Sequence, residues 1–223
     1  MYWEVKGVIV SLKKLLFDNS ASIGIGALII FIAMLLVAGI TASVLIQTMN
    51  SLQEQALKTG EETIRNVASG LEVTHVSGYN NGTKITQLAI FITPSIASED
   101  IDLTYAYISL SDSSTKAVLT YSSNCSSTSV SNGLFGTINS SNLTSTTYGL
   151  IVIRDVDGSC SASLPIINSR DLVVLLVNTS KCFSGIDKRD EVFGNVYPEY
   201  GMSGVIGFTA PSAFVDTIID LQP

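Results

Sequence analysis

The chain has 223 residues and a formal net charge of −7, so it lacks the basic surface with which proteins bind nucleic-acid phosphates. Its single histidine and three cysteines match none of the common zinc patterns. Hydrophobic residues make up 46 % of the chain, and after its most apolar segment there is room for one domain of more than about 100 residues.

That apolar segment lies near the N-terminus. Residues 19–53 contain no Asp, Glu, Lys or Arg, and residues 23–46 are almost wholly apolar. A helix over residues 23–46 is about 36 Å long, enough to cross a bilayer core of about 30 Å. Lys13 and Lys14 precede it, and basic residues beside a spanning segment favour the cytoplasm. We therefore predict that this segment lies in a membrane or in an equally dry protein interior, with the following residues outside the cell.

The helical pattern continues past the apolar segment. Apolar residues recur at the three- and four-residue spacing of one helix face. They are Leu45, Met49, Leu52, Ala56, Ile64, Val67 and Leu71. On the opposite face, Glu61 and Arg65 are spaced for an ion pair. One helix is therefore predicted from about residue 22 to about residue 71, and its polar half packs either on the following domain or against copies of itself.

The second half of the chain has the composition of a β-domain. Residues 78–83 have hairpin-turn chemistry, and short runs rich in β-branched and aromatic residues follow. The predicted strands are 88–93, 103–110, 117–121, 148–154, 172–178, 204–209 and 213–221. The predicted fold class is α+β: a long N-terminal hydrophobic helix followed by an antiparallel, Ig-like β-sandwich or barrel.

Residues 122–147 are dominated by Ser, Thr and Asn, which predicts an exposed loop. Sequons for N-linked glycosylation occur in this loop and on both sides of it. The candidate asparagines are Asn81, Asn124, Asn139, Asn142 and Asn178. Chance matches are common in Ser/Thr-rich sequence, so we expect N-linked glycans at about half of them. The alternative is an unmodified hydrophilic loop.

The three cysteines all fall in the part predicted to be outside, where an oxidising environment permits one disulfide. If the strands ending at residues 121, 154 and 178 form a meander, the first and third end on the same side. This predicts a Cys125–Cys182 bond, with Cys160 as an alternative partner. The other possibility is three unpaired core residues.

Chemistry-bearing motifs are sparse. Asp155 and Asp157 resemble part of a calcium loop without its distal glutamate, so a bound structural cation is one interpretation and a tight acidic turn the other. His75 has no catalytic partner in the sequence pattern. We predict no cofactor and no enzymatic activity.

Both ends of the chain are similar to one protein family. Lys13-Lys14 followed by residues 24–38, Gly-Ile-Gly-Ala-Leu-Ile-Ile-Phe-Ile-Ala-Met-Leu-Leu-Val-Ala, resembles the N-terminus of archaellins, the filament proteins of the archaeal flagellum. Residues 196–211, Val-Tyr-Pro-Glu-Tyr-Gly-Met-Ser-Gly-Val-Ile-Gly-Phe-Thr-Ala-Pro, look like the archaellin C-terminus. Bacterial type IV pilins carry a glutamate near the mature start, whereas this chain has none there before Glu54.

The resemblance implies a class III signal peptide over residues 1–21. A prepilin-type signal peptidase would cut between Ala21 and Ser22, with Ser20 as the next candidate. A filament-core helix over 22–75 and an extracellular β-sandwich domain over 76–223 would remain. The helix positions predicted to pack in the filament core are Gly24, Gly26, Leu28, Ile29, Phe31, Ile32, Met34, Leu35, Leu36 and Gly39.

The implied function is a structural subunit of an extracellular swimming filament at the cell surface. Its partners would be identical or closely related subunits and a membrane assembly platform with its ATPase, and the precursor would be inserted in the inner membrane. An archaeal type IV adhesion pilin is the alternative. A single-pass anchored binding domain or enzyme is a third possibility.

Overall fold

The computed structural model describes residue 13 and residues 19–96 and 98–223. The chain divides into two compact units, residues 1–59 and residues 60–223. Most of the predicted signal peptide, residues 1–21, falls outside the described residues. The second unit is called the β unit below.

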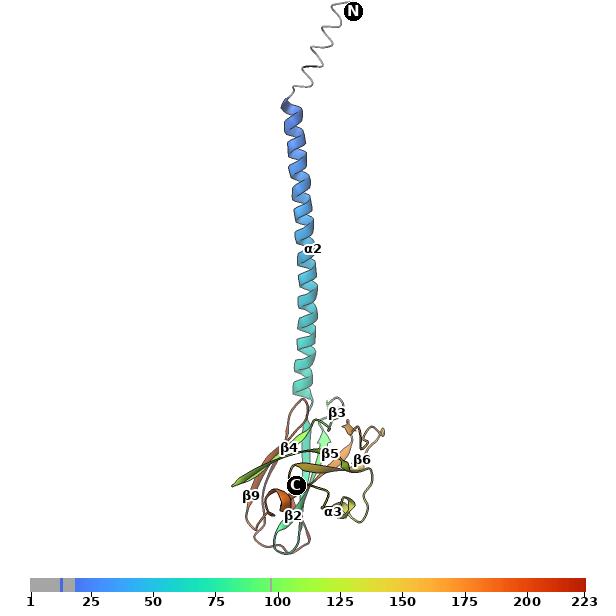
Figure 1. Ribbon diagram of the computed structural model, residues 1–223, viewed down its shortest axis with the longest axis vertical. Coiled ribbons are helices and arrows are strands. Elements are labelled where there is room, and N and C mark those ends of the chain that lie inside the picture. The colour runs from blue at the N-terminus through green and yellow to red at the C-terminus, as the bar shows by residue number, and fades with distance from the viewer. Residues whose placement is uncertain (1–12, 14–18, 97) are drawn as a thin grey trace, which may run out of the picture. The chain divides into compact units, whose positions relative to one another are not determined.

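The helix α2 (Asn19–Ala68) contains 50 residues (Figure 1). No proline interrupts it, and Leu, Ile, Ala and Met dominate its first half, which favours a helix locally. At ~1.5 Å per residue it is about 75 Å long. Among the described residues it is the one helix long and apolar enough to cross a bilayer.

The predicted helix boundary at residue 71 or 75 is wrong, because the helix ends at Ala68. Directly after it the chain pairs with a distant segment: the Leu71 amide donates to the Met202 carbonyl at 3.0 Å, and the Met202 amide donates to the Ser69 carbonyl at 2.9 Å. Gly201 makes this approach possible, because a Cβ at that position would lie 2.2 Å from the Ser69 oxygen. Leu71 therefore leaves the helix stripe and enters the β core.

The β unit contains the strands and two short helices. They are β1 (Leu71–Asn80), β2 (Ile85–Pro94), β3 (Ile101–Asp102), β4 (Tyr107–Asp112), β5 (Thr115–Ser127), α3 (Leu134–Thr137), β6 (Thr147–Arg154), β7 (Ile166–Ile167), β8 (Leu172–Asn178), α4 (Thr179–Cys182), β9 (Glu191–Tyr197), β10 (Gly204–Thr209) and β11 (Ile218–Gln222). Nine strands form one sheet in the order β10-β9-β4-β5-β6-β8-β2-β1-β11. Neighbouring strands are antiparallel except β5 and β6, which are parallel.

The sheet curls until its two edge strands nearly meet. At the seam, the side-chain amide of Gln222 in β11 accepts from the Gly207 amide at 3.0 Å and donates to the Val205 carbonyl at 3.3 Å, both in β10. The enclosed face holds the main hydrophobic core, which contains apolar residues from β1, β2, β4 to β6 and β8 to β10. The predicted α+β class with an antiparallel, barrel-like domain is confirmed.

The Ser/Thr-rich segment is not simply an exposed loop. It contains the end of β5 and the short helix α3, and it buries Cys125, Phe135, Ile138 and Leu143 in a second hydrophobic cluster. This cluster lies against the outward-facing residues of β2, β6 and β8. A few apolar side chains in a polar segment therefore cover one half of the outer sheet face.

Two predicted strands are shorter than expected. Residues 103–106 form a turn, in which the buried Tyr148 hydroxyl donates to the carbonyls of Leu103 and Ala106 at 3.1 Å each. In the last predicted strand only residues 218–222 pair. The sequence pattern did not predict the strands β1 and β9. The residues of β1 were assigned in part to the end of the helix. In β9, Gly194 breaks the run of β-branched and aromatic residues, and only glycine fits there because a Cβ would lie 2.1 Å from the Ser109 oxygen of β4.

Candidate functional site

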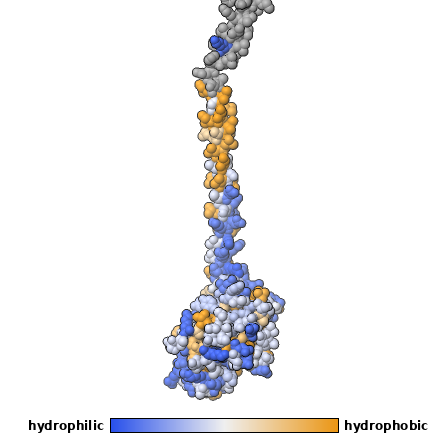
Figure 2. Space-filling view, viewed as in Figure 1, coloured by the Kyte–Doolittle hydropathy of each residue, from blue (hydrophilic) through white to orange (hydrophobic). Residues whose placement is uncertain are grey.

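The apolar half of α2 is the main candidate site. Five consecutive apolar residues, 28–32, cover the whole circumference of the helix. Fifteen large apolar side chains between Ile23 and Ile46 are 47 to 72 % exposed. Figure 2 shows them as a continuous apolar surface on this part of the helix. A helix that is apolar on every side is stable only in a membrane or among other helices.

The structure places all ten predicted packing positions in this half of α2. An added Cβ at Gly24, Gly26 or Gly39 would meet nothing within 4 Å. Glycine inside a helix costs about 1 kcal/mol relative to alanine. Because the chain itself makes no use of the missing side chains, the glycines leave room in which another helix can approach closely.

Two threonine hydroxyls near the end of this segment form hydrogen bonds within the helix. The Thr41 hydroxyl lies 3.0 Å from the carbonyls of Val37 and Ala38, and the Thr48 hydroxyl donates to the Leu45 carbonyl at 2.9 Å. Such back-bonds remove the need for water at these hydroxyls. The segment is therefore suited to an environment without water.

The last nine residues of α2, from Gly60 to Ala68, belong to the β unit, and Arg65 ties them to its loops. The Arg65 Nε lies 3.1 Å from the Glu99 carboxylate, and its guanidinium lies 3.9 Å from the centroid of the Tyr200 ring. The predicted Glu61–Arg65 pair is replaced by these contacts, because loops far away in the sequence bring better partners. Farther up the helix, Met49 and Leu52 stay exposed in the single chain.

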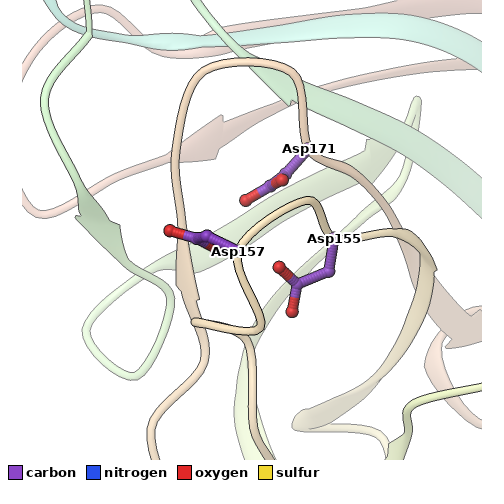
Figure 3. Close-up of side chains that lie close together, drawn as sticks. All are labelled: Asp155, Asp157 and Asp171. Atoms are coloured by element: carbon purple, nitrogen blue, oxygen red, sulfur yellow. The ribbon is translucent and has the colours of Figure 1, made fainter.

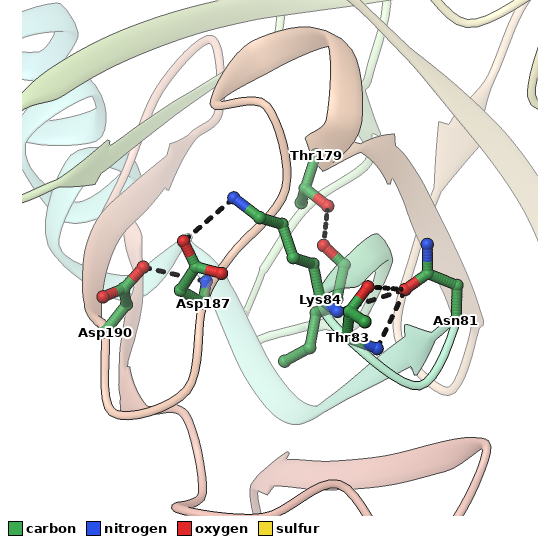
Figure 4. A network of polar contacts seen from close by, with 7 residues as sticks. Asn81, Thr83, Lys84, Thr179, Asp187 and Asp190 are labelled. Carbon is green, nitrogen blue, oxygen red and sulfur yellow. Dashed lines mark hydrogen bonds and ion pairs between the residues drawn. The ribbon is translucent and has the colours of Figure 1, made fainter.

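One sequon has a well-ordered, exposed geometry. Asn81 and Thr83 lie in the turn between β1 and β2, and both are exposed. The Asn81 Oδ1 accepts from the Thr83 amide at 3.1 Å, the Thr83 hydroxyl at 2.8 Å and the Lys84 amide at 3.1 Å (Figure 4). The adjacent Lys84 ammonium pairs with Asp187 at 2.9 Å and fixes the end of this hairpin. The turn presents the Asn81 side chain at the surface.

The other sequons differ in accessibility. Asn178 is only 6 % exposed, and its amide donates to the Ser140 carbonyl at 2.9 Å while its Oδ1 accepts from the Lys181 amide at 3.3 Å. It anchors the loop to α4 and is not available for modification in the folded chain. Asn124, Asn139 and Asn142 are exposed.

All three cysteines, each within the described residues, are free thiols, so the predicted Cys125–Cys182 bond is absent, as is one to Cys160. The assumed meander is not formed, because β5 and β6 run parallel. Cys125 belongs to the outer hydrophobic cluster, whereas Cys182 packs against the main core. Burial raises the pKa of Cys160 to about 12 and that of Cys182 to about 11.

An acidic turn brings the two predicted cation ligands, Asp155 and Asp157, together with Asp171. Their carboxylate oxygens lie within 4.8 Å of one another (Figure 3). Asp171 is fully buried and accepts from the Val156 amide at 3.1 Å and the Asn168 amide at 3.0 Å. No motif pointed to Asp171, because it joins the turn only through the fold. Backbone amides thus organise the turn, and the structural cation stays a prediction.

His75 takes part in a Ser–His–Asp grouping that lacks the geometry of a catalytic relay. Its Nε2 lies 2.9 Å from the Ser77 hydroxyl and 3.1 Å from the Asp220 carboxylate. In a relay the serine and the aspartate contact different ring nitrogens. The grouping instead links β1 to β11.

Comparisons with known proteins identify the family to which this sequence is similar. The family model for archaeal-type flagellin matches residues 21–208. The chain is 42 % identical over 213 residues to Flagellin B2 of Methanocaldococcus jannaschii, covering 94 % of this chain and 98 % of that protein. It is 38 % identical over 218 residues to Flagellin B1 of Methanococcus voltae, covering 95 % and 100 %.

Solved structures agree. The crystal structure of archaeal flagellin FlaB1 from Methanocaldococcus jannaschii superposes with a TM-score of 0.63 at 37 % identity, covering 70 % of this chain and 98 % of that one. The archaeal flagellum of Methanospirillum hungatei strain JF1 has the same fold, with a TM-score of 0.63 at 13 % identity over 90 % of this chain and 99 % of that one. With its apolar helix, its barrel-like domain and these relatives, the chain belongs to the archaeal-type flagellin family.

Proposed function

We propose that this chain is a structural subunit of the archaeal flagellum filament and polymerises through the apolar half of α2. The observation that carries the proposal is the all-round exposure of apolar side chains over residues 23–46. Because the fifteen side chains are 47 to 72 % exposed, moving them out of water is worth roughly 10–30 kcal/mol, from about 1.5 to 3 kcal/mol for each fully exposed side chain. A free subunit therefore does not persist in water, and its helix passes from lipid into a bundle of identical helices.

The same solvent argument sets the order of assembly. The precursor waits in the cytoplasmic membrane with residues 23–46 in lipid and the β unit outside. A prepilin-type signal peptidase removes residues 1–21 between Ala21 and Ser22, and a membrane platform with its ATPase then feeds subunits into the filament. Head-to-tail contacts that do not close generate a helical filament rather than a ring.

The exposed sequons are the proposed N-glycan acceptors. Asn81, Asn124, Asn139 and Asn142 are all accessible, whereas Asn178 is held inside the fold by its own hydrogen bonds. Glycans at the accessible positions would enlarge the polar outer surface of the filament. Peptide mass spectrometry of purified filaments is expected to find modification among these four and none at Asn178.

The decisive experiment is mild shearing of cells. Sheared filaments, viewed by electron microscopy and subjected to N-terminal sequencing, are expected to contain this chain starting at Ser22. A deletion strain is expected to lose swimming, whereas loss of surface attachment with swimming retained would favour an adhesion pilin. Recovery of the chain only as a membrane-embedded monomer would contradict the proposed function.

A further inference from the structure

The outer face of the sheet is covered on one half and bare on the other. Over β2, β6 and β8, the chain's own loop supplies a hydrophobic cluster. Over β4, β5, β9 and β10, partly exposed apolar side chains point outward and belong to neither cluster. We call this set the aromatic face: Tyr107, Val118, Phe193, Tyr197 and Val205.

Strand register brings these five side chains together. Tyr107 and Tyr197 are direct partners on β4 and β9, and their rings stack with centroids 4.8 Å apart and an interplanar angle of 19°. In the next row, Val118 and Val205 lie on either side of the smaller Ser109 and Asn195. Phe193 is 47 % and Val205 is 62 % exposed. The result is an apolar patch in which Ser109 and Asn195 separate the two valines, and the row that contains Phe193 ends at the exposed Lys116 of β5.

Beside Phe193 lies open space above a glycine. Gly207 of β10 is its register partner, and an added Cβ at Gly207 would meet nothing within 4 Å. Glycine inside a strand weakens the sheet and often marks a place where another backbone approaches closely. Nothing in the described part of the chain uses this space.

We propose that the aromatic face docks against a second copy of this chain in the filament. The size of the face favours a partner that is already held nearby by another contact. Four of its side chains are 40 to 62 % exposed and Tyr197 is partly buried, so the face offers roughly 300–500 Å² of apolar surface, below the ~800 Å² per partner that an independent interface needs. The contact therefore works between copies that the helix core already holds together, where the second contact is effectively intramolecular.

The positions of the sequons agree with this assignment. Asn81 lies in the turn between β1 and β2, Asn178 at the end of β8, and the other three within residues 122–142. None lies on β4, β9 or β10. Asn124 is in β5, the strand that also carries Val118, but it lies six residues farther along, so glycans on the accessible sequons leave the rows of β4, β9 and β10 free for a neighbouring subunit. The inference rests on the proposed filament.

The test measures coverage of the face directly. Val205→Cys adds a thiol on the face, and Val156→Cys is a matched control, because Val156 is also 62 % exposed but lies in the acidic turn. Purified sheared filaments are treated with a maleimide before and after dissociation in detergent. The native thiols give a low background, since Cys125 and Cys160 are buried and Cys182 is partly so.

In intact filaments, the Val205→Cys thiol is expected to label about tenfold less than in dissociated chains, because a covered thiol excludes the reagent. The Val156→Cys thiol is expected to label equally in both states. Equal labelling of Val205→Cys in both states would overturn the proposal. So would a thiol that is protected on whole cells but labelled in purified filaments, because its cover would then be a component other than a second copy of this chain. Failure of the proposed function is distinguishable, because wild-type cells would then yield no filaments that contain this chain.

A second variant checks the result without a thiol. Gly207→Val adds a β-branched side chain in open space, so it is expected to leave unchanged or raise the unfolding midpoint of the detergent-solubilised chain. The same variant is expected to lower the temperature at which filaments dissociate by several degrees. Filaments of wild-type stability would contradict the docking of a second copy on this face.

Discussion

Truncating one side chain in the apolar half of α2 tests the filament core quantitatively. Leu35 is 57 % exposed in the single chain, and the proposed bundle buries it completely. Leu35→Ala in a packed interior removes apolar contacts and leaves a cavity, at a cost of about 2–5 kcal/mol. Since 1.4 kcal/mol is tenfold, each subunit would be held in the filament from about 30-fold to several thousand-fold more weakly.

The assay is the resistance of sheared filaments to rising detergent, followed by the fraction of chain that still sediments. Leu35→Ala filaments are expected to dissociate at a lower detergent concentration than the wild type. Leu164→Ala is the control, because Leu164 is 50 % exposed on the β unit and its truncation is expected to change stability by less than about 0.5 kcal/mol. Circular dichroism of the solubilised chains should show equal helix content. If Leu35→Ala filaments resist detergent as well as wild-type filaments do, the apolar segment is not buried in the core of the filament.

Four further predictions concern the β unit. Tyr148→Phe removes the buried hydroxyl whose hydrogen is shared between the Leu103 and Ala106 carbonyls, so thermal unfolding of the solubilised chain should show a loss of about 1–3 kcal/mol. Thiol titration of the denatured, unreduced chain should count three free cysteines, whereas one would indicate a disulfide. Hydrogen bonds from Ser159 and Asn168 lower the pKa of Asp157 to about 2, below its unfolded value of about 3.9. Its stabilising effect is therefore present above about pH 4 and lost as the pH falls towards 2, so the difference in melting temperature between wild type and Asp157→Asn should shrink over that range. In the same assay at neutral pH, added Ca²⁺ should raise the melting temperature of the wild type but not of Asp157→Asn if the predicted structural cation binds here. If Ca²⁺ does not raise the melting temperature, these aspartates serve only to form the acidic turn.

The helix and several strands were predictable because their signals are local. Residues 23–46 are apolar on every helix face, so no other part of the chain was needed to recognise them. The strands β2, β6, β8 and β10 were found close to their observed bounds from β-branched runs that are continuous or alternate cleanly. Both ends also carry the residues that resemble the archaellin family, and the family match confirms that resemblance.

Other features depend on partners far apart in the sequence. The helix ends at Ala68 because residues 69–71 bond to Met202, and Arg65 turns to Glu99 and Tyr200 for the same reason. Asp171 completes the acidic turn only after the strands have paired. No local pattern encodes such contacts, since each is formed by two segments that are brought together by burial elsewhere.

The sequence by itself determined that this protein has a helix too apolar for water and a β-rich remainder suited to the cell exterior. Only the tertiary structure decided how the sheet is ordered, which half of its outer face the polar loop covers and which half stays bare. The physical reason is that hydrophobicity and periodicity are properties of one segment. Strand register and coverage are properties of pairs of segments, and the free energy that selects them comes from the whole core.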